Sequence, residues 1–182
     1  PEPIENKVLE ILKEHNIKSG EYILLCPGAS FANKRWPSDR FAHLALKLIV
    51  EGHNVVLSGG NSEKESCEMI AAYSQNKALD LAGKLSIIES AVLAKHAKVV
   101  VVNDTGMLHI AEALGTPVVG IYGPTDKQLG YYPILPKSRI AEVELPCRPC
   151  TKMGAAECPK KHWKCMKNIT VDQVMNELNQ IL

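Results

Sequence analysis

The chain has 182 residues, of which 46% are hydrophobic, 23% charged and 5% aromatic. That length suits one domain or at most two small ones, and the apolar content can fill a core, so a disordered or fibrous chain is excluded. The 21 Lys and Arg residues against 20 Asp and Glu residues leave a net charge of +1. This near-neutral balance argues against a general nucleic-acid binder. No apolar run approaches the roughly 18 residues of a membrane span.

The apolar pattern predicts one leading helix and then a series of short strands. Apolar residues recur at helical spacing from Pro3 to His15 and stop before Ser19-Gly20, as in an amphipathic helix. Continuous apolar runs without alternation are typical of strands covered on both faces. Such runs occupy residues 22–26, 54–57, 98–102 and 117–122, with weaker candidates at 78–81 and 139–143.

Helix signals separate these strands. Ser38 is a candidate cap for a helix over residues 39–51, which Gly52 would end. Three further pairs have the spacing of capping boxes, namely Ser62 with Glu65, Ser86 with Glu89, and Thr170 with Gln173. Because strands alternate with helices, we expect an α/β domain with a doubly wound parallel sheet of the Rossmann type. Residues 144–169 lack periodicity and are rich in Cys, Pro and Lys, so we expect an ordered excursion there before a closing helix over residues 170–182.

The predicted strands end in polar or glycine-rich loops, at residues 27–30, 58–62, 103–106 and 123–126. Carboxyl ends of parallel strands meet at one edge of a sheet, where ligands bind in such folds. One such loop could simply supply turn residues. Four together favour an anionic ligand such as a diphosphate, held by backbone amides and helix N-termini. Neither a G-x-G-x-x-G nor a P-loop motif is present, which disfavours a nicotinamide dehydrogenase and a P-loop NTPase.

Charged and polar residues near these loops are the candidates for the site. Lys34 and Arg35 follow the first loop and could either supply charge there or be solvated cations. The densest polar cluster runs from Asn103 through Asp104, Thr105 and Gly106 to His109. Asp104 or Thr105 can cap the next helix, which would end at Gly115, and His109 would lie in its first turn.

In their order and spacing these motifs resemble glycosyltransferase family 9, the ADP-heptose:lipopolysaccharide heptosyltransferases. The matching pieces are Pro27-Gly28-Ala29-Ser30, Lys34-Arg35-Trp36-Pro37 with Arg40-Phe41, Gly59-Gly60 with Glu63, residues 80–86, Asn103-Asp104-Thr105-Gly106 with His109, and Gly123-Pro124-Thr125. They cover residues 22 to about 182. The spacing of Cys147, Cys150, Cys158 and Cys165 resembles the heptosyltransferase II branch in particular.

The resemblance implies a GT-B enzyme with two Rossmann-like domains, of which this chain matches the C-terminal, donor-binding half. Residues 1–20 would then be an interdomain helix or linker and residues 21–182 the donor domain; a start at Pro1 without Met fits a chain cut from a larger enzyme. Carried over by motif, Ser30, Lys34 and the backbone at Thr105-Gly106 would contact the donor diphosphate. Glu63 would hold the ribose, Leu85 would lie against the adenine, and Asp104 with His109 would orient the sugar.

The same resemblance implies an inverting, metal-independent transfer of heptose from ADP-heptose to a lipopolysaccharide inner-core acceptor. Lys34 and helix-terminal amides would stabilise the diphosphate leaving group. The acceptor and its general base belong to the N-terminal domain. We therefore expect this chain to bind ADP or ADP-sugar without transferring sugar alone. The intact enzyme would be cytoplasmic, in peripheral contact with the inner membrane, and would bind no nucleic acid.

The excursion leaves two questions open. Cys147, Cys150, Cys158 and Cys165 could hold a structural zinc ion, although the second pair is not Cys-x-x-Cys; unliganded packing and disulfides are the alternatives. Six cations against Glu157 could face anionic lipid or an acidic acceptor, or could form a solvated surface.

Two other hypotheses come from different functional classes. One is another GT-B enzyme, an epimerase or a transferase with a different donor. The other is a zinc- and nucleic-acid-binding module.

Overall fold

The computed structural model describes residues 2–182, and Pro1 lies outside this range. The strands are β1 Tyr22–Cys26, β2 Asn54–Leu57, β3 Leu79–Asp80, β4 Val99–Asn103, β5 Val118–Tyr122 and β6 Arg139–Glu142. They form a six-stranded sheet in the order β3-β2-β1-β4-β5-β6, and every neighbouring pair is parallel. In register, Leu24 of β1 lies beside Val56 of β2 and Val100 of β4. The predicted doubly wound parallel sheet is confirmed.

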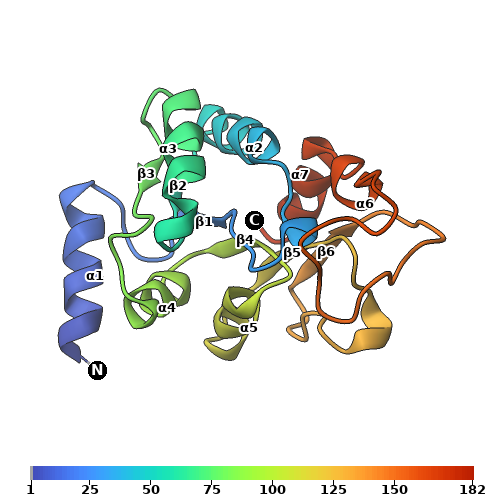
Figure 1. Cartoon of the computed structure of the whole chain (residues 1–182). Helices are drawn as coiled ribbons and strands as arrows, with labels where there is room; N and C mark the ends of the chain where they lie inside the picture. Colours follow the sequence, from blue (N-terminus) through green and yellow to red (C-terminus); the bar gives the residue numbers. More distant parts are fainter. Residues whose placement is uncertain (1) are drawn as a thin grey trace.

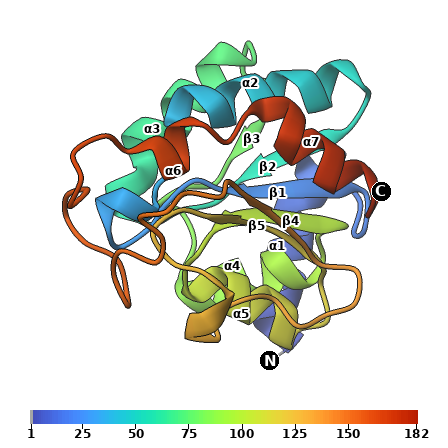
Figure 2. The same cartoon turned by 90° about the vertical axis from the view of Figure 1, so that its right-hand side faces the viewer.

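Helices cover both faces of this sheet. Their bounds are α1 Glu2–Glu14, α2 Ser38–Val50, α3 Lys64–Tyr73, α4 Ile87–Lys95, α5 Gly106–Ala113, α6 Lys164–Lys167 and α7 Val171–Asn179. Helices α2, α3 and α7 lie on one face, and α1, α4 and α5 lie on the other (Figures 1 and 2). The three layers leave the carboxyl ends of the strands at one edge of the sheet.

Strand β1 shows why the continuous apolar runs of the sequence form the central strands of the sheet. All five of its residues are buried. Ile23 and Leu25 belong to the core under α2, α3 and α7, while Tyr22, Leu24 and Cys26 belong to the core over α1, α4 and α5. Because successive side chains point to opposite faces, a strand between two helical layers must be apolar at every position.

One of the three predicted capping boxes forms in full, at α4; at α7 the Thr170 cap forms as predicted, but the Gln173 side chain donates to the Glu142 carbonyl instead of returning to Thr170. The Ser86 hydroxyl accepts from the Glu89 amide at 3.3 Å, and the Glu89 carboxylate accepts from the Ser86 amide at 2.6 Å. Thr170 Oγ1 accepts from the Gln173 amide at 3.1 Å at the start of α7. As predicted, Gly52 follows α2 with a left-handed φ of 90°.

Two other cap predictions were wrong, and a third was correct only in position. The turn before α3 starts two residues early, as a 3-10 turn over Asn61–Glu63, so Glu63 rather than Glu65 bonds back to a free amide, that of Gly60. Helix α2 starts at Ser38 itself and has no side-chain cap. The third prediction holds in position only: Thr105 is the N-cap residue of α5, but its side chain makes no capping hydrogen bond, and the Asp104 carboxylate bonds to other residues described below.

Between residues 2 and 182, none of the helices combines the length and the apolar character needed to cross a membrane.

Candidate functional site

The site lies where the strand order reverses. The chain winds outward from β1 to β3 on one side and from β4 to β6 on the other, so a crevice opens beyond the ends of β1 and β4. Two cavities occupy this crevice, with volumes of about 540 Å³ and 230 Å³. Both are lined by Ser30, Thr105 and Gly106, so they adjoin along the loop after β1 and the start of α5. Together they form one continuous cleft.

A buried amide holds the two loops of this cleft together. Asn103 ends β4 and is fully buried. Its Nδ2 donates to the carbonyls of Pro27 and Gly28 at 2.8 and 3.2 Å, and its Oδ1 accepts from the Trp36 amide at 3.1 Å. Asn103 therefore fixes the course of the loop after β1 from the strand beside it.

Glu63 enters the larger cavity because two glycines leave room for it. A Cβ on Gly28 would lie 2.7 Å from Glu63 Cγ, and a Cβ on Gly59 would lie 2.6 Å from Glu63 Cβ. The Glu63 carboxylate accepts from the Gly60 amide at 2.9 Å and from the Ser62 hydroxyl at 2.7 Å. It is therefore held in a set orientation at the cavity wall.

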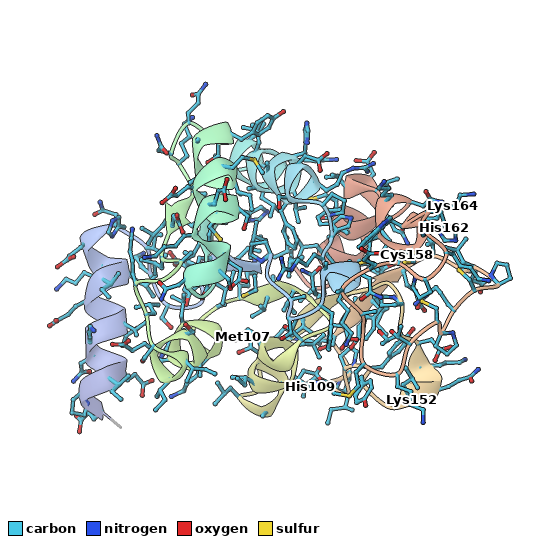
Figure 3. All side chains as sticks on the ribbon, in the orientation of Figure 1. Met107, His109, Lys152, Cys158, His162 and Lys164 are labelled. Carbon is cyan, nitrogen blue, oxygen red and sulfur yellow. The ribbon has the colours of Figure 1, made fainter. Side chains whose placement is uncertain are left out.

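The larger cavity also has an apolar lining, supplied by Leu85, Ile87, Met107 and Ile110. Met107 is in the first turn of α5 (Figure 3). Apolar side chains beside one oriented carboxylate suit a flat ring joined to a group that bears hydroxyls.

The smaller cavity contains a buried ion pair. Lys34 Nζ lies 2.6 Å from Asp104 Oδ2, and the two side chains are only 11% and 4% exposed. The fully buried Thr125 donates its hydroxyl to the same Oδ2 at 2.7 Å. Lys34 Nζ also lies 5.9 Å from the centre of the Tyr131 ring, within range of a cation–π contact. A lysine ammonium has three protons to donate, so Lys34 can bond to Asp104 and still donate to an anion in the cavity.

The start of α5 lies between the two cavities. Its first amides have no acceptor within the helix, so they can donate to an anion. His109 projects from the same helix and lines the smaller cavity (Figure 3). Met153, which belongs to the excursion, also lines this cavity and is 64% exposed.

The cleft brings together all the residues that the sequence nominated for donor binding, which are Ser30, Lys34, Glu63, Leu85, Asp104, Thr105, Gly106 and His109. Their individual roles stay predictions. Sequence reasoning missed Tyr131 and Met153, and it did not identify Thr125 as the partner of Asp104. Nothing in the local sequence marks Tyr131 or Met153, because each reaches the cleft from a loop without a motif.

The cysteines of the excursion do not form a metal site in this arrangement. Cys147 Sγ lies 3.7 Å from His162 Nε2, but residues 2–182 contain no group of three or more His, Cys, Asp or Glu side chains that could hold a metal ion. All four thiols are free. Burial raises the pKa of Cys165 to about 11. Burial also acts on Cys158, but hydrogen bonds from the backbone amides of residues 160–163 outweigh it and lower the pKa of that thiol.

Comparison with known proteins assigns this chain to a family. The model of the glycosyltransferase family 9 (heptosyltransferase) family matches residues 4–163. Lipopolysaccharide heptosyltransferase 2 of Escherichia coli K12 is 35% identical over 162 residues, which are 86% of this chain and 45% of the relative. Lipooligosaccharide heptosyltransferase 2 of Haemophilus ducreyi is also 35% identical, over 86% of this chain and 46% of its own. The chain thus spans about half the length of these curated relatives.

Solved structures agree with this assignment. The E. coli ADP-heptose lps heptosyltransferase II superposes on the whole chain with a TM-score of 0.77 and 28% identity, and 51% of it is covered. A glycosyl transferase family 9 structure from Veillonella parvula has the same fold, with a TM-score of 0.85 at 22% identity, over the whole chain and 52% of its own. The chain therefore belongs to glycosyltransferase family 9, the heptosyltransferases.

Proposed function

We propose that this chain is the donor-binding domain of a heptosyltransferase and that its cleft binds ADP-heptose. The observation that carries the proposal is the order of groups along the cleft. The larger cavity offers apolar side chains and Glu63, the shared wall offers the first amides of α5, and the smaller cavity offers Lys34 and Asp104. That order matches a nucleoside, a diphosphate and a sugar laid end to end.

In this arrangement Leu85 packs against the adenine and Glu63 accepts hydrogen bonds from the ribose hydroxyls. Ser30, Lys34 and the amides at Thr105-Gly106 bind the diphosphate. A diphosphate leaving group gains negative charge as the sugar departs, and donors fixed in advance stabilise that charge. The ammonium and the helix N-terminus supply positive charge from the chain itself, so we propose a transfer that needs no metal.

Asp104 and His109 remain for the sugar. The Asp104 carboxylate already accepts from Lys34 and Thr125, so its role is to orient sugar hydroxyls and to hold Lys34. By family analogy, the lipopolysaccharide acceptor and the general base that activates it belong to the half of the relatives that this chain does not span.

Nucleotide titration tests the proposal. Isothermal calorimetry of the chain should show ADP binding more tightly than UDP, with the same affinity in the presence of EDTA. Preference for UDP would indicate a GT-B enzyme with another donor. The absence of any nucleotide binding, together with salt-dependent binding of nucleic acid, would overturn the assignment in favour of the nucleic-acid module.

We also propose that the exposed lysines of the excursion contact an anionic membrane surface. These lysines are Lys152, Lys160, Lys161, Lys164 and Lys167. None of these five forms an ion pair with a carboxylate of residues 2–182. A lysine near an anionic leaflet gains about 1 kcal/mol. Co-sedimentation with vesicles containing phosphatidylglycerol should exceed that with neutral vesicles, and equal binding to both would contradict the proposal.

A further inference from the structure

The excursion packs directly against the loop that follows β1. The backbone N–H of Asn33 donates to the Ala155 carbonyl at 3.2 Å, and the backbone N–H of Ala155 donates to the side-chain Oδ1 of Asn33 at 2.7 Å. Gly154 lies so close to Phe31 that a Cβ there would be 2.7 Å from the Phe31 Cβ. In both views the excursion and the 3-10 turn Ala32–Lys34 lie side by side (Figures 1 and 2). The excursion therefore supports the loop that carries Lys34.

Arg148, at the base of the excursion, binds the loop that follows β5. Its guanidinium donates to the carbonyls of Gly123 at 2.5 Å, Thr125 at 2.7 Å and Val143 at 2.5 Å. It also pairs with the Glu142 carboxylate at 2.5 Å, and its side chain is only 6% exposed. Lysine could not replace it, since only the planar fork of arginine can meet four acceptors in these directions.

The contacts of Arg148 continue into the proposed donor site. Arg148 fixes the backbone of Thr125, and the hydroxyl of Thr125 donates to Asp104 Oδ2. That same oxygen pairs with Lys34 Nζ at 2.6 Å. Each of these groups is buried, so a shift of the Thr125 backbone would move the carboxylate and with it the ammonium.

We propose that Arg148 is a positioning residue for the diphosphate end of the donor, acting through Thr125 and Asp104 on Lys34. The inference rests on the proposed function of the cleft. It gives the excursion a role in donor binding, because its base orients the ion pair of the smaller cavity. It also separates the two ends of the cleft, since Arg148 has no contact with Glu63 or Leu85, which line the larger cavity.

The test compares two nucleotides in two arginine variants. Arg148→Met keeps the apolar stem and removes every donor. Arg139→Met is the matched control, because Arg139 also donates to backbone carbonyls, those of Pro136 and Ser138, but touches neither loop of the site. Calorimetry should show Arg148→Met weakening ADP about tenfold or more, the loss expected when one hydrogen bond to a charged group is misplaced. The affinity for AMP, which lacks the β-phosphate, should stay within about twofold, and Arg139→Met should change neither.

Thr125→Val gives the same test without touching Arg148. It removes the hydroxyl that links the loop to Asp104, so ADP should weaken while AMP does not. If Arg148→Met fails to fold, this variant still tests the link from Thr125 to Asp104 through which Arg148 would act, and an unchanged ADP affinity would overturn the inference.

Two results would overturn the inference while leaving the proposed function intact. One is ADP binding of wild-type strength in either variant. The other is an equal loss of ADP and AMP affinity, which would mark Arg148 as a merely structural residue. If the wild-type chain binds no ADP, the proposed function fails first, and this inference falls with it.

Discussion

At the scale of single residues, the site depends on a pairing that spacing alone could not show. Lys34 and Asp104 are 70 positions apart, and sequence reasoning placed both at the same edge of the sheet without joining them. Their contact depends on the exact length of the loop after β1 and on Asn103, which ties that loop to β4. Such side-chain contacts across loops carry no periodic signal, whereas strand-end positions do.

Because of this ion pair, substitution of Lys34 should affect the stability of the fold as well as ADP binding. Lys34→Ala leaves the buried Asp104 carboxylate with Thr125 as its remaining partner, and an uncompensated buried charge costs about 3–5 kcal/mol. We expect the single variant to lose both ADP affinity and thermal stability. In the double variant Lys34→Ala with Asp104→Asn, much of the stability should return while ADP binding stays weak.

Melting temperature and ADP calorimetry on the single and double variants check this prediction, with Asp104→Asn alone completing the cycle. Stability that stays low in the double variant would show that the lost charge pair is not the cause. An unchanged ADP affinity in Lys34→Ala would remove Lys34 from the proposed donor site.

At the scale of elements, ion pairs join α1 to α4. Val8 and Leu12 bury the apolar face of α1, as its periodicity predicted. Lys7 pairs with Glu89 at 2.6 Å, and Glu5 pairs with Lys95 at 2.7 Å. Glu89 thereby serves two purposes, as a member of the capping box of α4 and as the partner of α1. Sequence reasoning found the first of these and could not find the second, because nothing local relates two helices 80 residues apart.

Acid should weaken this attachment in a defined pH window. The hydrogen bond from Lys7, followed by those from the Ser86 amide and hydroxyl, lowers the pKa of Glu89 from 4.5 to about 2. A carboxylate with a depressed pKa stabilises the fold above its unfolded pKa, and this contribution is lost as the pH falls through the folded value. The melting temperature of wild type should therefore exceed that of Glu89→Gln above pH 5, and the difference should shrink between about pH 4.5 and 2.

Glu177→Gln is a suitable control, because Glu177 is on α7, away from α1 and α4. Its melting temperature should follow wild type throughout. A gap between Glu89→Gln and wild type that persists unchanged at pH 2 would contradict the assignment of the effect to the Glu89 carboxylate.

Some secondary-structure elements can be predicted from the sequence more completely than others. The central strands can be predicted from sequence because a strand covered on both faces needs apolar residues throughout. The composition of the excursion predicted where it lies in the sequence but not its conformation. Single contacts, such as those of Arg148 and Asn33, fix that conformation. The Ser62 cap failed for a similar reason. A turn can start two residues earlier when a nearby carboxylate, here that of Glu63, satisfies the free amide.

At the scale of the whole molecule, the cleft is suited to holding a donor and lacks a free carboxylate base among residues 2–182. Glu63 and Asp104 are the carboxylates that line its two cavities. Both are engaged, Glu63 by the Gly60 amide and the Ser62 hydroxyl, and Asp104 by Lys34 and Thr125. These donors fix both carboxylates in position, so we assign neither of them the role of a general base for an incoming hydroxyl.

We therefore expect the 182-residue chain to bind ADP-heptose without transferring heptose. The purified chain would be incubated with ADP-heptose and a lipopolysaccharide inner-core acceptor, and ADP release and acceptor mass would be followed. Neither should exceed the background without protein, while calorimetry on the same sample shows the donor bound. A full-length relative such as the E. coli lipopolysaccharide heptosyltransferase 2, assayed in parallel, controls for the substrates.

Measurable transfer would contradict this expectation and place a general base within this chain. His109 would then be the first candidate, because its imidazole lines the smaller cavity beside Lys34 and Asp104. In that case His109→Gln should abolish the transfer and leave ADP affinity unchanged, since the imidazole would act on the acceptor hydroxyl rather than on the diphosphate.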